Sequence, residues 1–180
     1  MGKLVLKNIT FTLDPKSIQR AVNQIKAVEK GLVKGLQELA KTLIEHGVVV
    51  AKMYVAQWGA IDSGTLVDSI DGEYNESDHS GRIWTDCNYA VYVEFGTGIV
   101  GESMPHPLSA ELGVSYDKNG HGDAGWWYPS EEGWYQPKDG GPLMAWTKGM
   151  PSRPFMYDTL RNLERIAEEE GGRIIAEYIP

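Results

Sequence analysis

The feature of this 180-residue sequence that most constrains its fold is a regular series of apolar residues between positions 15 and 55. They form two interleaved series, each spaced by sevens and offset by four, which places them on one face of a helix. Asp14 and Pro15 favour a helix start, so we expect a long amphipathic helix beginning near Pro15 with one buried stripe. The stripe residues are Ile18, Ile25, Leu32 and Leu39 in one series and Val22, Leu36, Leu43 and Val50 in the other.

Three glycines in this segment predict that the helix is bent or interrupted. Gly31, Gly35 and Gly47 each lower helix stability by about 1 kcal/mol relative to alanine. An unbroken helix from 15 to 55 would be about 60 Å long, longer than a domain of this size is wide. Either the helix breaks, or part of it projects to meet a partner. We favour an amphipathic helix packed on its own sheet over a free-standing coiled coil.

Three stretches are predicted to be strands, namely 3–13, 82–86 and 89–95. The first and the last alternate at the strand period of two, and 82–86 contains Ile83 and Trp84. The last two are joined by a connection too short for a helical crossover, so we expect an antiparallel meander. The alternating residues are Ile9, Phe11 and Leu13 in the first stretch and Tyr89, Val91 and Val93 in the last.

Two further segments are predicted to be helical. Residues 62–71 carry a turn glycine, Gly64, followed by one short amphipathic turn that can bury Leu66 and Ile70. The closing segment has apolar residues that step by four, three and four, the period of a helix. They are Met156, Leu160, Leu163 and Ala167.

The composition changes at Gly96. Residues 99–148 contain 8 Gly, 5 Pro and 4 of the 6 Trp, without sustained periodicity, which predicts a long Gly/Trp-rich loop insertion. We therefore expect a single α+β domain, with residues 14–98 and 149–180 as its core and 99–148 as the insertion. In this fold the long N-terminal helix and a C-terminal helix pack on a small antiparallel sheet.

The net charge of −8 argues against specific or non-specific binding of nucleic acid, whose phosphates it would repel. The apolar runs end well before the roughly twenty residues that cross a bilayer, so we expect no membrane partner. A single cysteine, Cys87, cannot form an intramolecular disulfide.

One glycine pattern has the form of a dinucleotide-binding loop but lacks its context. Residues 96–101 read G-x-G-x-x-G, with Asp117 at the distance of a ribose-binding acid. Pro105 and Pro107, however, stand where the phosphate-binding helix should run. We expect no dinucleotide and no other cofactor.

Metal ligands and nucleophiles show no catalytic spacing. Residues 117–123 resemble the first half of a calcium loop, but Tyr128 stands where the bidentate glutamate belongs, so a surface turn is favoured. The four histidines, His46, His79, His106 and His121, form no i, i+4 pair. We expect no enzyme and no metal. The alternative is a metal-dependent hydrolase that uses His106, His121, Asp117 and Asp123, with Glu94 as the base.

Glu94 is a charged residue in an otherwise apolar segment, so its burial would require a partner. One hypothesis is an ion pair with Arg153 that ties the sheet to the C-terminal helix. The other is an exposed carboxylate on an edge strand.

Three segments together resemble one family. They are Asp-Ser-Gly-Thr-Leu-Val-Asp-Ser-Ile at 62–70, Tyr-Ala-Val-Tyr-Val-Glu-Phe-Gly-Thr at 89–97 and Pro-Ser-Arg-Pro-Phe at 151–155. In this order, between a long and a short helix, they resemble the HK-ninety-seven type tail-component family of long-tailed bacteriophages over residues 15–170. Members often have Pro and Thr before the first motif glycine, where this chain has Ile61, Asp62 and Ser63. The matching motif positions are Gly64, Tyr89, Ala90, Glu94, Gly96, Thr97, Arg153, Pro154 and Phe155.

The resemblance implies a structural virion protein, a tail-completion, minor tail or head-tail joining component, with no catalytic residues. It further implies a homo-oligomeric ring in the tail or neck, assembled in the bacterial host cytoplasm. Expected partners are the tail terminator, tail tube or head-closure proteins. Aromatic residues of the insertion suit an interface, because they offer large area for few rotatable bonds. The candidate interface residues are Trp126, Trp127, Tyr128, Trp134 and Tyr135.

Overall fold

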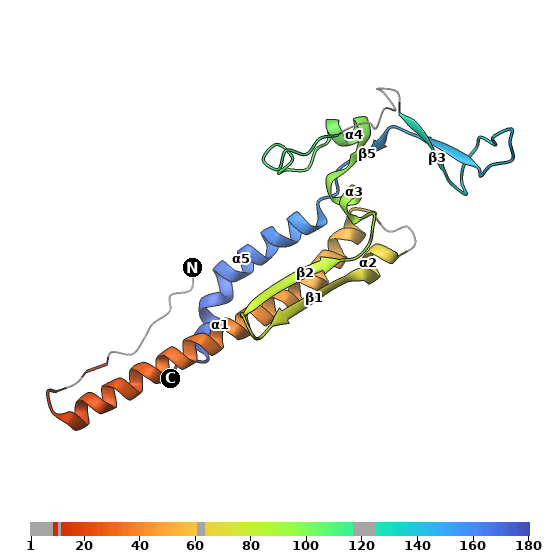
Figure 1. The fold of residues 1–180 in the computed structure, drawn as a ribbon. Helices are drawn as coiled ribbons and strands as arrows, with labels where there is room; N and C mark the ends of the chain where they lie inside the picture. Colours follow the sequence, from red (N-terminus) through yellow and green to blue (C-terminus); the bar gives the residue numbers. More distant parts are fainter. Residues whose placement is uncertain (1–8, 11, 61–63, 117–124) are drawn as a thin grey trace. The chain divides into compact units, whose positions relative to one another are not determined.

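A computed structural model of the chain has the expected α+β class, with five helices and five short strands among the residues described (Figure 1). It describes residues 9–10, 12–60, 64–116 and 125–180. The contacts divide the chain into two compact units. Unit 1 comprises residues 1–54, 70–85 and 157–180, and unit 2 comprises residues 55–69 and 86–156. The division into a core and an insertion at 99–148 stays a prediction.

Helix α1 (Pro15–Gln57) begins where the sequence predicts, and Asp14 is its N-terminal cap. The Asp14 carboxylate accepts a hydrogen bond from the Ser17 backbone N–H at 2.9 Å. The expected interruption is wrong, because α1 is a single helix of 43 residues, about 65 Å long.

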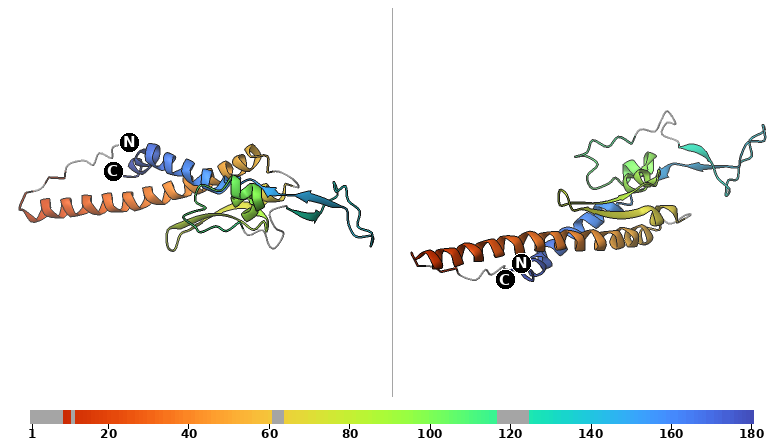
Figure 2. Two further views of the ribbon diagram at one scale, coloured as in Figure 1. Left: turned by 90° about the horizontal axis from the view of Figure 1, so that it is seen from above. Right: turned by 60° about the horizontal axis from the view of Figure 1, so that its bottom comes forward.

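The glycines of α1 are explained by close packing in unit 1. Helix α5 (Phe155–Ala176) runs beside α1 in all three ribbon views (Figures 1 and 2). A Cβ atom built on Gly35 would lie 2.9 Å from the Cα of Ile175, and one on Gly31 would overlap the carbonyl of Tyr178. The glycines therefore allow the C-terminal segment to approach the α1 backbone, and this contact offsets their low helix propensity.

A hairpin of strands β1 (Ile70–Asn75) and β2 (Ser80–Thr85) completes unit 1. The strands are antiparallel, with Gly72 opposite Ile83. The hairpin lies along α1, where Cβ atoms built on Gly72 or Gly81 would overlap Ile44 (Figure 1).

The predicted stripe of α1 is buried only in part. Val50 is 6% exposed and Leu39 and Leu43 are half-buried, as expected of a helix packed on its own sheet. The earlier stripe residues contradict the prediction, because they are exposed in the structure. They are Ile18, Val22, Ile25, Leu32 and Leu36.

The predicted first strand at 3–13 is not found among the described residues of that stretch. Ile9, Thr10, Thr12 and Leu13 have no strand pairing, and Leu13 is exposed. Phe11 and residues 3–8 lie outside the described part of the chain. An alternation of three apolar residues is a weak signal, because it does not specify a pairing strand.

Unit 2 contains the short turn predicted after Gly64, which is helix α2 (Thr65–Ser69). Leu66 is buried as expected, and Gly64 has a positive φ of 85° that suits glycine. The predicted strand at 89–95 is wrong, because these residues form helix α3 (Ala90–Phe95), and the antiparallel meander is therefore wrong too.

The reason for this error is that a short apolar run does not distinguish the two periods. The buried residues of α3 are Ala90, Val93 and Glu94, which follow the helical spacing of three and four. The Ala90 N–H donates to the Cys87 carbonyl at 3.0 Å, so the chain already turns before α3 begins.

The sequence predicts a long loop at 99–148, but the segment contains regular elements. It contains most of helix α4 (Gly98–Ser103) and the antiparallel strands β3 (Trp126–Pro129) and β4 (Met144–Thr147). The two-residue strand β5 (Gly149–Met150) follows β4. Within unit 2 the β3–β4 hairpin extends away from α3 and α4 (Figures 1 and 2). Among the residues described, no helix is long and apolar enough to cross a membrane.

Candidate functional site

The three family-like segments meet in unit 2, although they are far apart in sequence. The first contact joins α2 to the residue before α3, where the Leu66 N–H donates to the Tyr89 hydroxyl at 3.2 Å. Leu66 is 1% exposed, and Ala90 is also buried. Tyr89 therefore fixes the short α2 turn to the start of α3.

The second contact joins the end of α3 to the segment before α5. Gly96 has a φ of 77°, and a Cβ atom on it would lie 2.6 Å from the Ser152 nitrogen. Next to it, Thr97 forms an antiparallel bridge with Met150, whose N–H donates to the Thr97 hydroxyl at 3.2 Å. Only glycine fits such a close approach in this conformation, which gives the motif glycine a physical reason.

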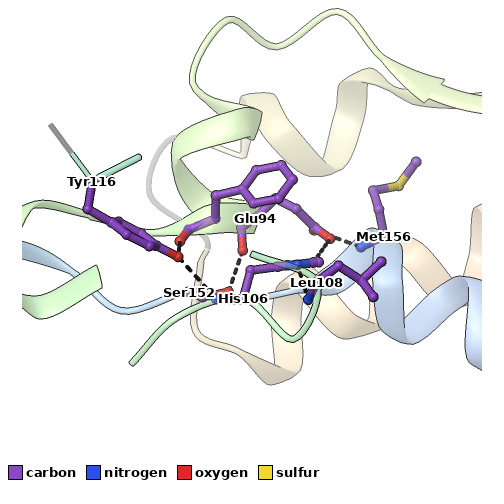
Figure 3. Close-up of polar contacts among 7 residues, drawn as sticks. Glu94, His106, Leu108, Tyr116, Ser152 and Met156 are labelled. Atoms are coloured by element: carbon purple, nitrogen blue, oxygen red, sulfur yellow. Dashed lines mark hydrogen bonds and ion pairs between the residues drawn. The ribbon is translucent and has the colours of Figure 1, made fainter. Parts of the chain in front are cut away.

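The centre of this junction is a buried pair of ionisable side chains, Glu94 and His106 (Figure 3). Glu94 is 8% exposed and His106 is 3% exposed. The His106 Nε2 atom lies 3.1 Å from Glu94 Oε1. The second carboxylate oxygen, Oε2, accepts a hydrogen bond from the Met156 N–H at 2.9 Å. Both oxygens of the buried carboxylate thus have polar partners, as burial of a charge requires.

The contact with Met156 makes Glu94 the cap of helix α5. Pro154, just before α5, has no side-chain acceptor for a backbone N–H of the first turn. The Glu94 carboxylate takes that role and places a negative charge at the positive end of the helix.

The side chain that contacts Glu94 is His106 and not the predicted Arg153. Among the described residues, the side chain that contacts Glu94 Oε1 is His106, at 3.1 Å. Arg153 joins the junction through its backbone instead, because its N–H donates to the Val93 carbonyl at 2.9 Å. The alternative of an exposed edge-strand carboxylate is wrong as well, since Glu94 is buried on a helix.

The hydrogen bonds of His106 define its tautomer. Its Nδ1 atom accepts the Leu108 N–H at 3.1 Å, so the ring proton is on Nε2 and is donated to Glu94. The ring also lies 4.6 Å from the Phe95 ring, centroid to centroid. The Tyr116 hydroxyl accepts the His106 backbone N–H at 3.2 Å and donates to the Phe95 carbonyl at 3.0 Å.

This arrangement is suited to holding segments together rather than to metal chemistry. Both ring nitrogens of His106 take part in hydrogen bonds within the protein, so neither presents a free lone pair to a ligand. In the described ranges there is no group of three or more His, Cys, Asp or Glu residues that could hold a metal ion. The hydrolase alternative also needs Asp117, His121 and Asp123, which lie outside the described residues, as does the calcium-like loop.

The remaining candidates lie elsewhere. His79 is in unit 1, within hydrogen-bond distance of Gln37 and Tyr74, and His46 is exposed on α1. In the G-x-G-x-x-G segment, Gly101 lies inside the six-residue helix α4 instead of opening a long one. The helix ends before Pro105, as the prolines predict, so the geometry gives no phosphate-binding helix.

A second feature of unit 2 is an aromatic cluster on the β3–β4 hairpin. Trp127 lies opposite Trp146 in the register, with ring centroids 5.2 Å apart. Trp134 and Tyr135 contact the same Trp127 ring at 4.8 and 5.2 Å. All four side chains are exposed, and Trp134 is 72% exposed. We call these four residues the aromatic cluster.

The aromatic cluster shares Trp127, Trp134 and Tyr135 with the predicted interface residues and differs from them at three positions. Trp126 belongs to the other face of the strand, where its ring lies next to Gly98. Trp146 belongs to the cluster but was missed, because only the strand register reveals that it is opposite Trp127. Tyr128 is exposed, but it follows Trp127 directly in the strand and therefore lies on the opposite face, outside the cluster.

No family model matches the chain, and no curated protein or solved structure shows significant similarity to it.

Proposed function

We propose that this chain is a structural virion protein, a tail-completion or neck component of a long-tailed bacteriophage. It oligomerises at the head-proximal end of the tail and joins the tail to the head. Its partners are further copies of itself and the tail terminator, tail tube or head-closure proteins. It works in the virion after assembly in the bacterial host cytoplasm, without a catalytic step.

The observation that carries an assembly role is the exposed aromatic cluster. Four large aromatic side chains lie together on one hairpin, with Trp134 72% exposed. Contiguous apolar surface of this kind marks interaction sites, since water contact with it is unfavourable. Trp and Tyr are also the residues that most often dominate binding energy in interfaces.

The narrower assignment to a phage tail is supported by the resemblance of the three segments. Four of the motif positions make contacts that hold the junction of unit 2 together. They are Tyr89, Glu94, Gly96 and Thr97. The motif residues thus have a structural role, and both ring nitrogens of His106 already form hydrogen bonds within the protein. These two observations favour assembly over hydrolysis.

The test is to delete the gene from the phage or prophage genome that carries it and to image the particles by electron microscopy. We expect filled heads beside detached or over-long tails, and normal particles when the intact gene is supplied in trans. Complementation with the Trp134→Ser variant should restore fewer joined particles than the matched surface variant Leu112→Ser. Normal, infectious tailed particles in the deletion strain would refute the proposal.

A further inference from the structure

The first half of α1 has an apolar face that the described part of the chain leaves exposed. Ile25 is 55% exposed and Leu36 is 49% exposed. The C-terminal segment of unit 1 approaches α1 at Gly31 and Gly35, which precede Leu32 and Leu36 and so lie about 100° away around the helix. It therefore packs on a neighbouring face. We call the exposed side chains the α1 stripe: Ile18, Val22, Ile25, Leu32 and Leu36.

The charge of this helical segment is opposite to that of the whole chain. Residues 15–37 contain five basic residues and one acidic residue, Glu29, which gives a net charge of +4 in a chain of −8. The basic residues are Lys16, Arg20, Lys26, Lys30 and Lys34. At about 100° per residue, Lys26 and Lys30 lie on one side of the α1 stripe, Glu29 lies within it, and Lys16, Arg20 and Lys34 lie towards the far side of the helix. A symmetric pair of two such helices would bring Lys26 and Lys30 of the two copies near each other, and this repulsion disfavours it. The α1 stripe therefore suits an apolar partner surface with acidic residues.

The β3–β4 hairpin of unit 2 has both an apolar surface and acidic residues. It exposes the aromatic cluster, and residues 126–147 carry three acidic residues and one basic residue, a net charge of −2. Glu131 and Glu132 lie between Trp127 and Trp134 in the sequence, and both are exposed. Lysine side chains that flank the α1 stripe could contact the faces of the aromatic rings, a further favourable interaction.

We propose that the α1 stripe of one copy binds the aromatic cluster of a second copy of this chain. The contact is head-to-tail, because each copy contributes a different surface, and such contacts close into rings when the rotation between copies permits. The inference rests on the proposed assembly function and names the surfaces through which the copies associate.

The first test measures the mass of the purified full chain by light scattering over a range of concentrations. We expect concentration-dependent association. The Ile25→Ser/Leu36→Ser variant and the Trp134→Ser variant should each weaken it by about tenfold or more, because they remove anchors at an interface centre. Leu112→Ser, which alters a side chain that is 58% exposed outside both surfaces, is the matched control and should associate as the unaltered chain does. Circular dichroism checks that each variant keeps its helix content.

The second test exchanges the charges. Lys26→Glu/Lys30→Glu and Glu131→Lys/Glu132→Lys should each reduce association at low salt, and an equimolar mixture of the two variants should restore it. A chain that stays monomeric at all concentrations, including one whose hairpin covers its own α1 stripe, would overturn the inference. Association that neither the apolar variants nor the charge variants weaken would also overturn it. The same holds if mixing the two charge variants fails to restore association. The particle phenotype of the deletion strain judges the assembly function separately.

Discussion

Glu94 on helix α3 caps helix α5 by accepting a hydrogen bond from the backbone N–H of Met156, 62 residues further along the chain. The same carboxylate accepts a hydrogen bond from the Nε2–H group of His106, so one buried side chain connects α3, the start of α5 and the segment after α4. A contact between residues so far apart forms only when the three segments are folded together. Glu94 therefore contributes to holding these three segments of unit 2 together.

We expect Glu94→Ala to lower the free energy of unfolding by about 3 kcal/mol. The change removes the cap of α5 and leaves the His106 Nε2 proton buried without its acceptor. Glu94→Gln should cost less, because the amide oxygen can still accept one of the two hydrogen bonds. Urea unfolding followed by circular dichroism measures the difference. Glu111→Ala, at an exposed position of the same unit, should leave the midpoint almost unchanged, and an equal loss in both variants would contradict the prediction.

The hydroxyl of Tyr116 links His106 to α3, so its removal should also destabilise unit 2. Tyr116→Phe deletes an acceptor for the His106 backbone N–H and a donor to the Phe95 carbonyl. We expect a loss of about 1–2 kcal/mol in the free energy of unfolding. Tyr92→Phe is the matched control, because Tyr92 is exposed and the same chemical change should have little effect there. Urea denaturation of both variants provides the comparison, and similar midpoints for the two would show that the Tyr116 hydroxyl is not needed.

Local features of this fold could be predicted from the sequence because local physics determines them. The start of α1 follows from a capping aspartate before a proline, and the α2 turn follows from Gly64 and two apolar residues four apart. The helix α3 could not be predicted in the same way, since its short apolar run fits either period. Its helical state depends on burying Ala90, Val93 and Glu94 together.

The partners of the site residues depended on tertiary contacts that no local pattern contains. The sequence indicates that Glu94 is a charge that needs a partner, but His106 follows it by 12 residues, with Pro105 between them and without a spacing rule that joins them. In the same way, the glycines of α1 predict breaks in the helix, because helix propensity is a local property. Their close approach to Ile175 and Tyr178 is a property of the folded unit.

The packing of α1 against the C-terminal segment predicts that Gly35→Ala destabilises the protein. In an isolated helix this change would be favourable by about 1 kcal/mol, because alanine has the higher helix propensity. In unit 1 the new Cβ would lie 2.9 Å from the Cα of Ile175, so backbone must move, and we expect a net loss of about 1–3 kcal/mol. Thermal unfolding measures the effect. Thr42→Ala, at an exposed position of the same helix, is the control and should be neutral or stabilising. A Gly35→Ala variant more stable than the unaltered chain would refute the close contact.

The N-terminal cap of α1 predicts a pH dependence at that end of the helix. Hydrogen bonds from the Thr12 hydroxyl and the Ser17 backbone N–H hold the pKa of Asp14 below its ordinary value of 3.8. A carboxyl whose pKa is lower in the folded state stabilises that state at pH values above its unfolded pKa, and this contribution is lost as the pH falls through the folded pKa. We therefore expect the amide of Ser17 to lose protection from hydrogen exchange as the pH falls below about 4. Nuclear magnetic resonance measures this amide directly. In the Asp14→Asn variant the cap cannot titrate, so the protection of Ser17, corrected for intrinsic exchange, should be independent of pH in this range; a dependence equal to that of the unaltered chain would show that Asp14 is not its source.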